Sequence, residues 1–310
     1  MYYFIVNPHS SNGRGERIWK KLEKLLKDWK VEYQCFMTEK PGDAKKIARF
    51  LTERVKEPRT ITAVGGDGTV NEILDGLLFC GPVTFGYIPT GSGNDLARSL
   101  RFPQDPKKCL KKILYSQNCK QMDYGVLSYG EDAVFHRRFC VSAGIGMDAA
   151  VCHNLLFSRK NQCFCGRHLG KLAYLFIGIK QLVLAKPVRG YLILDGVKKV
   201  EFNHIYFIAF HIHPYEGGGF RFAPQANPFD GKLAVSVVSH SSKRKLIPLF
   251  LSAYFGIRKK KHLKGIRTYE CREARIHTAR PMAVHTDGES CLCQDDLQVQ
   301  CIEKQLRIIV

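Results

Sequence analysis

Residues 64–72 read Val-Gly-Gly-Asp-Gly-Thr-Val-Asn-Glu and follow an apolar run that begins at Ile61. The apolar run predicts a strand, the glycines predict a tight turn, and the segment from Val70 to Phe79 predicts a helix. Backbone N–H groups at a helix start carry partial positive charge and bind phosphate. Glycines let the backbone approach an anion closely, because no Cβ stands in the way. The stretch therefore predicts a phosphate-binding turn, although a purely structural glycine-rich turn has the same pattern.

Two more loops, Asn7–Ser11 and Pro89–Asn94, follow predicted strands and carry glycines or small hydrogen-bond donors. Loops after parallel strands gather at one edge of a sheet, so the three loops together predict a nucleotide triphosphate site. Asp67 within the first turn is explained if it meets the phosphates through Mg²⁺ or orders the loop. The chain contains no G-x4-G-K-[ST] and no strand-linked G-x-G-x-x-G with a distal acid, which argues against P-loop and dinucleotide sites.

Strand and helix signals alternate through the first part of the chain. This alternation predicts a three-layer α/β domain with a mostly parallel sheet over residues 1–122. Strand signals then dominate, so residues 123–310 are expected to form a mainly antiparallel β-sandwich with a few helices. The last apolar strand, Arg307–Val310, can return to the first domain. The strands expected in the second domain are 124–127, 133–143, 188–194, 205–210, 233–238, 273–277 and 282–286, with helices at 149–156, 169–184 and 245–255.

The chain has 310 residues and a formal net charge of +20, with 48 Lys and Arg against 28 Asp and Glu. A net charge of this size indicates which partners the protein can attract, namely an anionic membrane, nucleic acid or a polyphosphate substrate, and says nothing about the fold. No nucleic-acid module is visible in the sequence, so no nucleic acid partner is expected. The longest apolar stretches, Leu172–Ile179 and Leu246–Ile257, are shorter than the ~20 residues of a membrane span. The N-terminus reads as a strand rather than a signal peptide, so we expect a cytoplasmic protein.

The 12 cysteines are then expected to be free thiols in a reducing compartment. Cys163 with Cys165 and Cys291 with Cys293 form C-x-C pairs. Zinc sites prefer C-x2-C pairs or histidine partners at set spacing, so most of these cysteines are expected to be small buried hydrophobes.

The runs Gly65–Glu72 and Pro89–Ala97 resemble the signature loops of the diacylglycerol kinase catalytic domain family, which includes bacterial soluble lipid kinases, sphingosine kinases and ceramide kinases. NAD kinases and phosphofructokinases share the Gly-Gly-Asp-Gly turn, but the second run is not expected in them. The resemblance implies a fold like that of NAD kinases and diacylglycerol kinases. It covers essentially the whole chain, because further family motifs resemble Tyr3–Ser11, Phe139–Ala149, Gly217–Gly219 with Pro224 and Asp230-Gly231, and Asp287–Glu289.

The resemblance implies that ATP is bound by the three loops and by a threonine after the second strand. Asp67 is implied to hold the nucleotide through Mg²⁺ or through the adjacent backbone. Apart from its position after a predicted strand, nothing in the sequence around Thr38 indicates a binding role. The implied ATP-binding residues are Asn7, Pro8, His9, Ser10, Ser11, Thr38, Gly66, Asp67, Gly68, Thr69, Val70, Asn71, Glu72 and Ser92.

The resemblance also implies a catalytic set of Glu289, Asp67 and Asp287. Phosphoryl transfer needs alignment, charge neutralisation and a carboxylate near the attacking oxygen. Glu289 is implied to be the general base that accepts the proton of the lipid hydroxyl. Asp287 is implied to position a catalytic metal or a lysine. A plain hairpin turn is the alternative for the Asp287-Gly288 pair.

The run Asn227–Lys232 resembles the structural Mg²⁺ loop of the family. The implied ligands are the side chain of Asp230 and the backbone carbonyls of Asn227 and Lys232, a sparse oxygen set that Mg²⁺ accepts. Phe229 and Gln225 stand where family members often carry an acid. An ordinary Asp-Gly turn is therefore the alternative for this loop.

Ser242–Ile257 is expected to form an apolar helix with basic residues at both ends. A charge run is usually a solvated face, but each Lys or Arg near an anionic bilayer contributes about 1 kcal/mol. With a lipid substrate, we expect peripheral binding to an anionic membrane surface. The basic residues are Lys243, Arg244, Lys245, Arg258, Lys259, Lys260 and Lys261.

The expected function is transfer of the γ-phosphoryl group of ATP, with Mg²⁺, to a lipid hydroxyl. Diacylglycerol is the favoured acceptor, giving phosphatidic acid in phospholipid biosynthesis. The alternatives are a NAD kinase-like soluble kinase, a kinase of sphingoid or other lipids, and a non-catalytic nucleotide-binding or membrane-docking protein. The sequence does not decide acyl specificity or whether the chain forms a homodimer.

Overall fold

The computed structural model describes residues 1–310 except 117, 131–132, 161–169, 241 and 248–264. The chain forms two compact units. Unit 1 comprises Met1–Asp123 together with Lys304–Val310, and unit 2 comprises Tyr124–Glu303. The last residues of the chain therefore belong to the same unit as the first.

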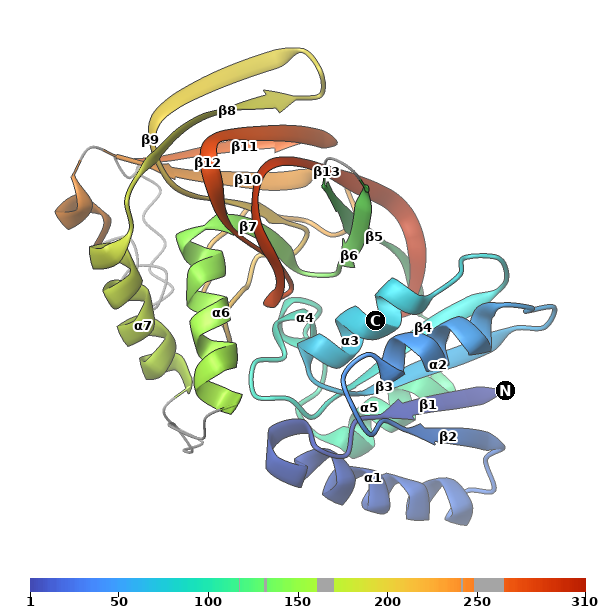
Figure 1. Cartoon of the computed structure of the whole chain (residues 1–310). Coiled ribbons are helices and arrows are strands. Elements are labelled where there is room, and N and C mark those ends of the chain that lie inside the picture. The colour runs from blue at the N-terminus through green and yellow to red at the C-terminus, as the bar shows by residue number, and fades with distance from the viewer. Residues whose placement is uncertain (117, 131–132, 161–169, 241, 248–264) are drawn as a thin grey trace. The chain divides into compact units, whose positions relative to one another are not determined.

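Unit 1 is a parallel sheet with helices on both faces, which confirms the predicted three-layer α/β fold (Figure 1). Helices α2 (Asp43–Thr52) and α3 (Asp67–Gly76) pack together on one face, and α1 (Ser10–Asp28) and α5 (Pro106–Tyr115) on the other. The short helix α4 (Asp95–Ser99) follows the fourth strand. The strands are β1 (Tyr2–Val6), β2 (Tyr33–Met37), β3 (Arg59–Gly65) and β4 (Val83–Pro89), and the end of β13 (Glu289–Ile309) pairs with β4.

The strand order in unit 1 is β2-β1-β3-β4, and these strands are parallel. From β1 the chain moves outward to β2, and it then returns to place β3 on the other side of β1. The direction of strand addition therefore reverses between β1 and β3. In open α/β sheets ligands bind outside the carboxyl ends of the strands at such a reversal.

The core of unit 1 explains why these segments form. In β1, Phe4, Ile5 and Val6 have no exposed surface, as expected for a strand covered on both faces. In α1, Trp19, Leu22 and Leu26 recur at helical spacing and are all buried. The rings of Phe4 and Trp19 lie 5.2 Å apart, which fastens α1 to the sheet.

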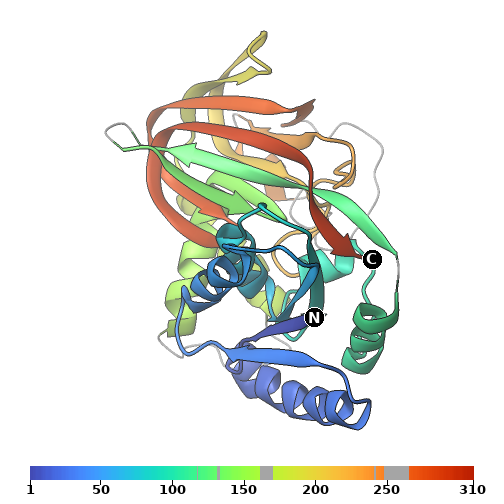
Figure 2. The ribbon, with the colours of Figure 1, turned by 90° about the vertical axis from the view of Figure 1, so that its right-hand side faces the viewer.

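Unit 2 is mainly antiparallel, which confirms the predicted β-sandwich. Its principal strand order is β11-β10-β9-β7-β12-β13, and β8 pairs with β9 and β12. Strand β5 (Cys119–Tyr129) pairs with β6 and β13, as Figure 2 shows from the side. The remaining strands are β6 (Phe135–Phe139), β7 (Ser142–Gly146), β8 (Val188–Leu194), β9 (Lys198–His211), β10 (Leu233–Ser239), β11 (Ile266–Cys271) and β12 (Glu273–Thr286).

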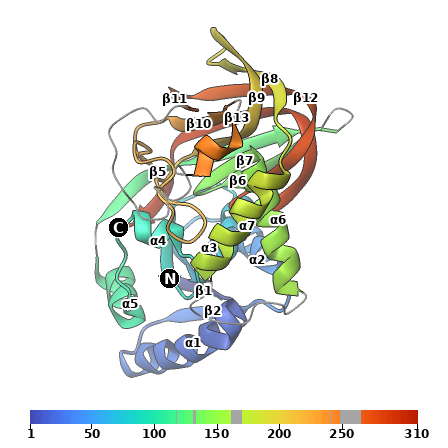
Figure 3. The ribbon, with the colours of Figure 1, turned by 90° about the vertical axis from the view of Figure 1, so that its left-hand side faces the viewer.

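Helices α6 (Met147–Lys160) and α7 (Gly170–Leu184) pack against each other in unit 2 (Figure 3). A short 3-10 helix, η1, spans Lys243–Leu246. None of the helices in the described residues is long and apolar enough to cross a membrane. Of the basic segment expected at Ser242–Ile257, only the first residues are described; residues 248–257 and the basic run 258–261 lie outside the described residues.

Several predicted boundaries in unit 2 are wrong. The strand expected at 133–143 is two strands, β6 and β7, interrupted at Cys140-Val141. The strands expected at 273–277 and 282–286 are one strand, β12, with a register shift between His277 and Met282. Most of β13 was not predicted, because its many exposed polar residues hide the alternation of a strand.

The ten described cysteines are free thiols. Cys291 is buried and Cys293 is exposed, although residues two apart in a regular strand share a face. Leu292 between them has φ 62°, so the strand is irregular at this point. The pair Cys163/Cys165 lies outside the described residues.

Candidate functional site

Three loops meet at the carboxyl ends of β1, β3 and β4. The Asn7 amide donates to Thr69 Oγ1 at 3.1 Å, which joins the first loop to the start of α3. The Ser10 and Thr90 hydroxyls lie 2.6 Å apart, which joins the first loop to the loop after β4. The N–H of Thr90 donates to Gly65 O at 2.8 Å, which joins the second and third loops. This is the edge of the sheet at which the strand order reverses.

Gly66 and Gly91 bring the second and third loops into backbone contact. A Cβ on Gly91 would lie 2.5 Å from the Cα of Gly66, and a Cβ on Gly66 would lie 3.1 Å from the Cα of Gly91. Asn94, in the left-handed region with φ 52°, holds the third loop: its amide donates to Gly91 O at 2.8 Å and its Oδ1 accepts from the Tyr87 hydroxyl at 3.2 Å. The glycines are therefore required by close approach of two loops.

The first loop carries local backbone strain. Ser11, Asn12 and Gly13 have φ values of 46°, 56° and 79° at the start of α1. Residues other than glycine seldom adopt such angles, and strain of this kind clusters at binding sites. The Ser11 hydroxyl is buried and has no hydrogen-bond partner among the described residues. Since buried hydroxyls normally have a partner, this loop fits a polar ligand.

Asp67 is the first residue of α3, and Gly66 before it has no side chain to cap the helix. The Asp67 Oδ1 accepts the N–H of Leu96 at 3.4 Å, and this bond ties the second loop to α4. A helix start that lacks a side-chain cap is a place where an anion can be held by backbone N–H groups.

The other expected ATP-binding residues are distributed around this edge. Thr38 is buried, and its N–H donates to Val6 O at 2.9 Å, so it lies next to the first loop. Val70 and Asn71 are buried within α3, so Val70 can offer a ligand only its backbone. His9 and Ser92 are exposed, while Pro8, Gly68 and Glu72 are half-buried.

The turn before Glu289 is a two-residue hairpin that joins β12 to β13. Asp287 and Gly288 have φ values of 48° and 86°, and Thr286 pairs with Glu289. Positive φ at both central residues is the type I′ pattern that favours Asp-Gly. The hairpin alternative therefore describes the backbone correctly. It leaves the role of the half-buried Glu289 open.

The carboxylate of Asp287 is engaged by the backbone of the segment between β6 and β7. Its oxygens accept the N–H groups of Cys140, Val141 and Ser142 at 2.6, 2.8 and 2.9 Å. The N–H of Asp287 donates to Ser142 O at 2.8 Å. The side chain therefore anchors the hairpin within unit 2, and its expected role toward a metal or a lysine stays a prediction.

The Asn227–Lys232 loop is held by its own side chains. Asp230 Oδ1 accepts the N–H of Lys232 at 3.0 Å, Asn227 Oδ1 accepts the N–H of Phe229 at 3.3 Å, and Gly231 has φ 72°. Asp230 is the only carboxylate within the loop, it is exposed, and one of its oxygens serves the turn. Mg²⁺ can complete its octahedron with water, but one oxygen of the single loop carboxylate already serves the turn. The Mg²⁺ site expected at Asn227, Asp230 and Lys232 therefore stays a prediction, and we derive no step through it.

A buried group of titratable residues lies beside the Asp287-Gly288 turn, and the sequence had not indicated it. His285 Nε2 is 3.5 Å from Asp148 Oδ2 and 3.4 Å from Glu216 Oε1. Glu216 Oε2 is 3.6 Å from His211 Nε2. Burial lowers the pKa of His211 to about 3, helped by the nearby His285, so His211 is neutral. Residues 148, 211, 216 and 285 come together only through the fold, so no spacing rule could have found them.

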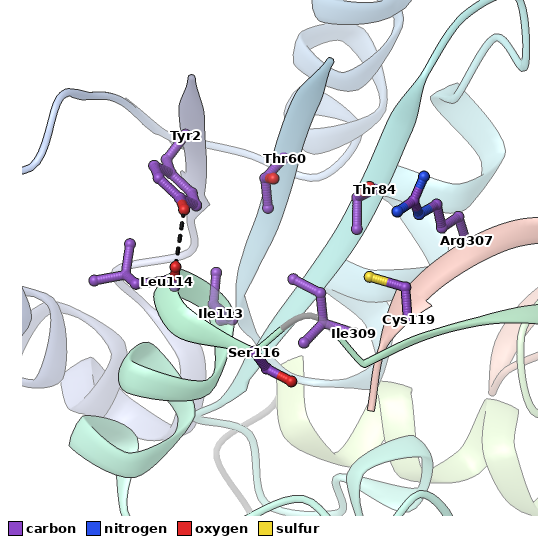
Figure 4. Close-up of a pocket in the computed structure, with 9 residues that line it drawn as sticks. All are labelled: Tyr2, Thr60, Thr84, Ile113, Leu114, Ser116, Cys119, Arg307 and Ile309. Atoms are coloured by element: carbon purple, nitrogen blue, oxygen red, sulfur yellow. Dashed lines mark hydrogen bonds between the residues drawn. The ribbon is translucent and has the colours of Figure 1, made fainter.

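A pocket of about 450 Å³ lies elsewhere in unit 1, where β1, β3 and β4 begin (Figure 4). Tyr2, Thr60 and Thr84, near the starts of these strands, line it together with Ser116 and Arg307. The Tyr2 hydroxyl donates to Leu114 O at 3.1 Å across one side. Because parallel strands start and end at opposite edges, this pocket is separate from the three loops.

Two family profiles match the sequence: "Diacylglycerol kinase catalytic domain" over residues 1–127, and "YegS C-terminal NAD kinase beta sandwich-like domain" over residues 141–310. "Putative lipid kinase YtlR" of Bacillus subtilis (strain 168) is 27% identical over 299 residues, which cover 93% of each chain. "Diacylglycerol kinase" of Mycobacterium tuberculosis H37Rv is 25% identical over 270 residues, which cover 86% of this chain and 82% of that one.

A crystal structure from Bacillus anthracis str. Sterne covers 99% of this chain and 96% of its own, with a TM-score of 0.76 and 24% sequence identity. Another structure from the same source, titled as a diacylglycerol kinase, has a TM-score of 0.71 at 22% identity. At these identities the likeness shows the fold.

The anchoring role of Asp287 can be tested by substitution. Asp287→Ala leaves three backbone N–H groups without their acceptor. It also places alanine at a positive φ, where a residue with a Cβ is strained unless its side chain makes a local hydrogen bond. We therefore expect a loss of several kcal/mol in the free energy of unfolding. Asp287→Asn keeps one acceptor oxygen and tolerates positive φ, so its loss should be smaller, about 1–3 kcal/mol. Urea unfolding measures both. Equal stability of both variants and the wild type would contradict the anchoring role.

Proposed function

Because the chain belongs to the diacylglycerol kinase catalytic domain family, a family of lipid kinases, we propose that it is an ATP-dependent lipid kinase. The proposed reaction transfers the γ-phosphoryl group of ATP to a lipid hydroxyl, with diacylglycerol as acceptor and phosphatidic acid as product. Relatives over most of the chain that are named diacylglycerol kinase, in Mycobacterium tuberculosis and Bacillus subtilis, support this acceptor.

The observation that carries the proposal is the meeting of three anion-friendly loops at the carboxyl edge of unit 1. The Ser10–Thr90 hydroxyl pair and the Gly66–Gly91 contact hold these loops together before any ligand arrives. A preformed set of donors binds triphosphate without the cost of ordering the loops. We therefore propose that residues 1–122 bind the nucleotide through Asn7–Ser11, Thr38, Gly66–Glu72 and Ser92.

Each proposed residue has a role that its surroundings support. ATP with Mg²⁺, when bound, supplies the phosphoryl group and neutralises its charge. Asp67, at the start of α3, orders the second loop through Leu96 and would hold the nucleotide-bound Mg²⁺. The backbone N–H groups at the start of α3 would hold phosphate oxygens. The hydroxyls of Ser10, Ser11 and Thr69 add hydrogen-bond donors around the same edge.

Glu289, in the β-rich part of the chain (residues 123–310) that we propose binds the lipid, would act as the general base. It is the first residue of β13 and directly follows the turn that Asp287 anchors. A carboxylate in this role accepts the proton of the lipid hydroxyl as the oxygen attacks phosphorus. Asp287 contributes by fixing the turn, which limits the positions that Glu289 can take.

A panel of acceptors tests the reaction. Purified protein is incubated with Mg-ATP and diacylglycerol, sphingosine, ceramide or NAD, and the products are identified by mass spectrometry. We expect phosphatidic acid. Glu289→Gln and Asp67→Asn should each lower kcat by roughly 10²–10⁴-fold, while Glu201→Gln, an exposed glutamate of β9, should leave it unchanged.

Phosphorylated NAD with no lipid product would instead favour the NAD kinase-like alternative, which shares the β-sandwich named in the second family profile. Phosphorylation of sphingosine, with no product from the other acceptors, would show that the acceptor is a sphingoid lipid and not diacylglycerol. An unchanged kcat in both Asp67→Asn and Glu289→Gln would show that neither carboxylate takes part in the reaction.

We also propose that the protein binds an anionic membrane surface peripherally, because of its net charge of +20 and its lipid acceptor. Vesicle sedimentation should show binding to vesicles with anionic lipid, weakening steeply with salt as surface charges are screened. Neutralising Lys243, Arg244, Lys245 and the basic run 258–261 should reduce this binding. Equal binding to neutral vesicles would contradict an electrostatic attachment.

A further inference from the structure

The buried group beside the Asp287-Gly288 turn bears on Glu289. The N–H of Gly288 donates to His285 Nδ1 at 3.1 Å. His285 has no exposed surface, so this bond is shielded from water. Together with the three bonds of the Asp287 carboxylate, it holds both residues that precede Glu289.

The bond to Gly288 determines where the imidazole carries its proton. Nδ1 must present a lone pair to accept an N–H, so the proton of a neutral His285 lies on Nε2. Nε2 faces Glu216 Oε1 at 3.4 Å and Asp148 Oδ2 at 3.5 Å. Burial lowers the pKa of His285, but hydrogen bonding to Asp148 and the charges of Glu216, Asp148 and Asp287 outweigh it and raise the pKa overall. These carboxylates favour a proton on Nε2. The raised pKa also favours a second proton, on Nδ1, which would break the bond to Gly288, so that bond belongs to the neutral form of His285.

The space around His285 is shaped for this arrangement. Gly144 of β7 pairs with His285 across the sheet. A Cβ on Gly144 would overlap the Asp148 carboxylate and would lie 2.8 Å from His285 Nε2. Asp148 comes from the first turn of α6, and Glu216 from the turn that closes on Phe220. Separate elements of unit 2 therefore hold the imidazole.

A transition metal is the competing explanation for this group. Ligand atoms of Cys152, Glu216 and His285 lie within 4.8 Å of one another, and thiolate, carboxylate and imidazole together suit zinc. A histidine that binds a metal through Nε2 carries its proton on Nδ1 and donates it to an acceptor. Here Nδ1 faces the N–H of Gly288, which is a donor. The geometry therefore favours a hydrogen-bonded support over a metal site.

We propose that His285 is a positioning residue for Glu289. In its neutral form, with Nε2–H facing the carboxylates of Asp148 and Glu216, it accepts the Gly288 N–H and so fixes the backbone from which Glu289 meets the acceptor hydroxyl. This inference rests on the proposed function of Glu289 as general base. His285 itself touches no reacting atom.

Two substitutions separate the two ring nitrogens. Asparagine places an oxygen near the position of Nδ1 and can still accept the Gly288 N–H, whereas glutamine places its amide near Nε2 and cannot. We expect kcat of His285→Gln to fall roughly 10–100-fold below that of His285→Asn, because a displaced base is poorly aligned, with KM for ATP unchanged in both. His277→Gln, a more exposed histidine of β12 paired with Asp296, is the matched control and should behave as the wild type.

Nitrogen NMR of the protein labelled at histidine tests the proton position in the wild type, and the His285→Gln protein is needed only to assign the signal. We expect an unprotonated Nδ1 and a protonated Nε2, assigned by the signal lost in His285→Gln. The reverse tautomer, a stoichiometric zinc ion found by elemental analysis, or equal kcat in the Asn and Gln variants would each overturn the proposal. An inactive wild type with the expected tautomer would instead reject the proposed function and keep the hydrogen-bond arrangement.

Discussion

The contact between the backbones of Gly66 and Gly91 is the constraint on which the rest of unit 1 depends. Two loops that follow neighbouring strands can meet so closely only if neither carries a Cβ at that point. Their contact places the start of α3 beside Thr90, and Thr90 in turn binds Ser10 of the first loop. A single steric requirement thus gathers three loops, each with backbone or hydroxyl donors, at the edge where an α/β sheet binds its ligand.

In unit 2 the corresponding constraint is that the Glu289 carboxylate lies at the tip of a long hairpin. Hairpin tips are exposed and mobile unless other groups hold them. Here the Asp287 carboxylate accepts hydrogen bonds from three backbone N–H groups, and His285 Nδ1 accepts one from the N–H of Gly288. The free energy spent on burying Asp148, Glu216 and His285 is explained if the exact placement of Glu289 matters for phosphoryl transfer.

Much of the fold follows from local patterns in the sequence. Apolar strands and amphipathic helices alternate in unit 1, and the loops at strand ends share an edge because parallel strands point the same way. The length of β13 did not follow, since its exposed polar residues and register shifts hide a strand. Nor did the group of His285, Asp148 and Glu216, whose members are far apart in sequence and meet only through sheet pairing and helix packing. The family resemblance implied a role of Asp287 toward a metal or a lysine, whereas its bonds to residues 140–142 are visible only in three dimensions.

The most direct test of this account is the affinity for ATP when the Gly66–Gly91 contact is disturbed. Isothermal titration calorimetry would compare the wild type with Gly91→Ala and with Gly178→Ala. Gly178 is a helical glycine of α7, and a Cβ on it would meet no atom of the described residues within 4 Å. We expect Gly91→Ala to weaken Mg-ATP binding by roughly tenfold or more, at least 1.4 kcal/mol, and Gly178→Ala to leave it unchanged. A folded Gly91→Ala protein that binds Mg-ATP as tightly as the wild type would contradict the central claim.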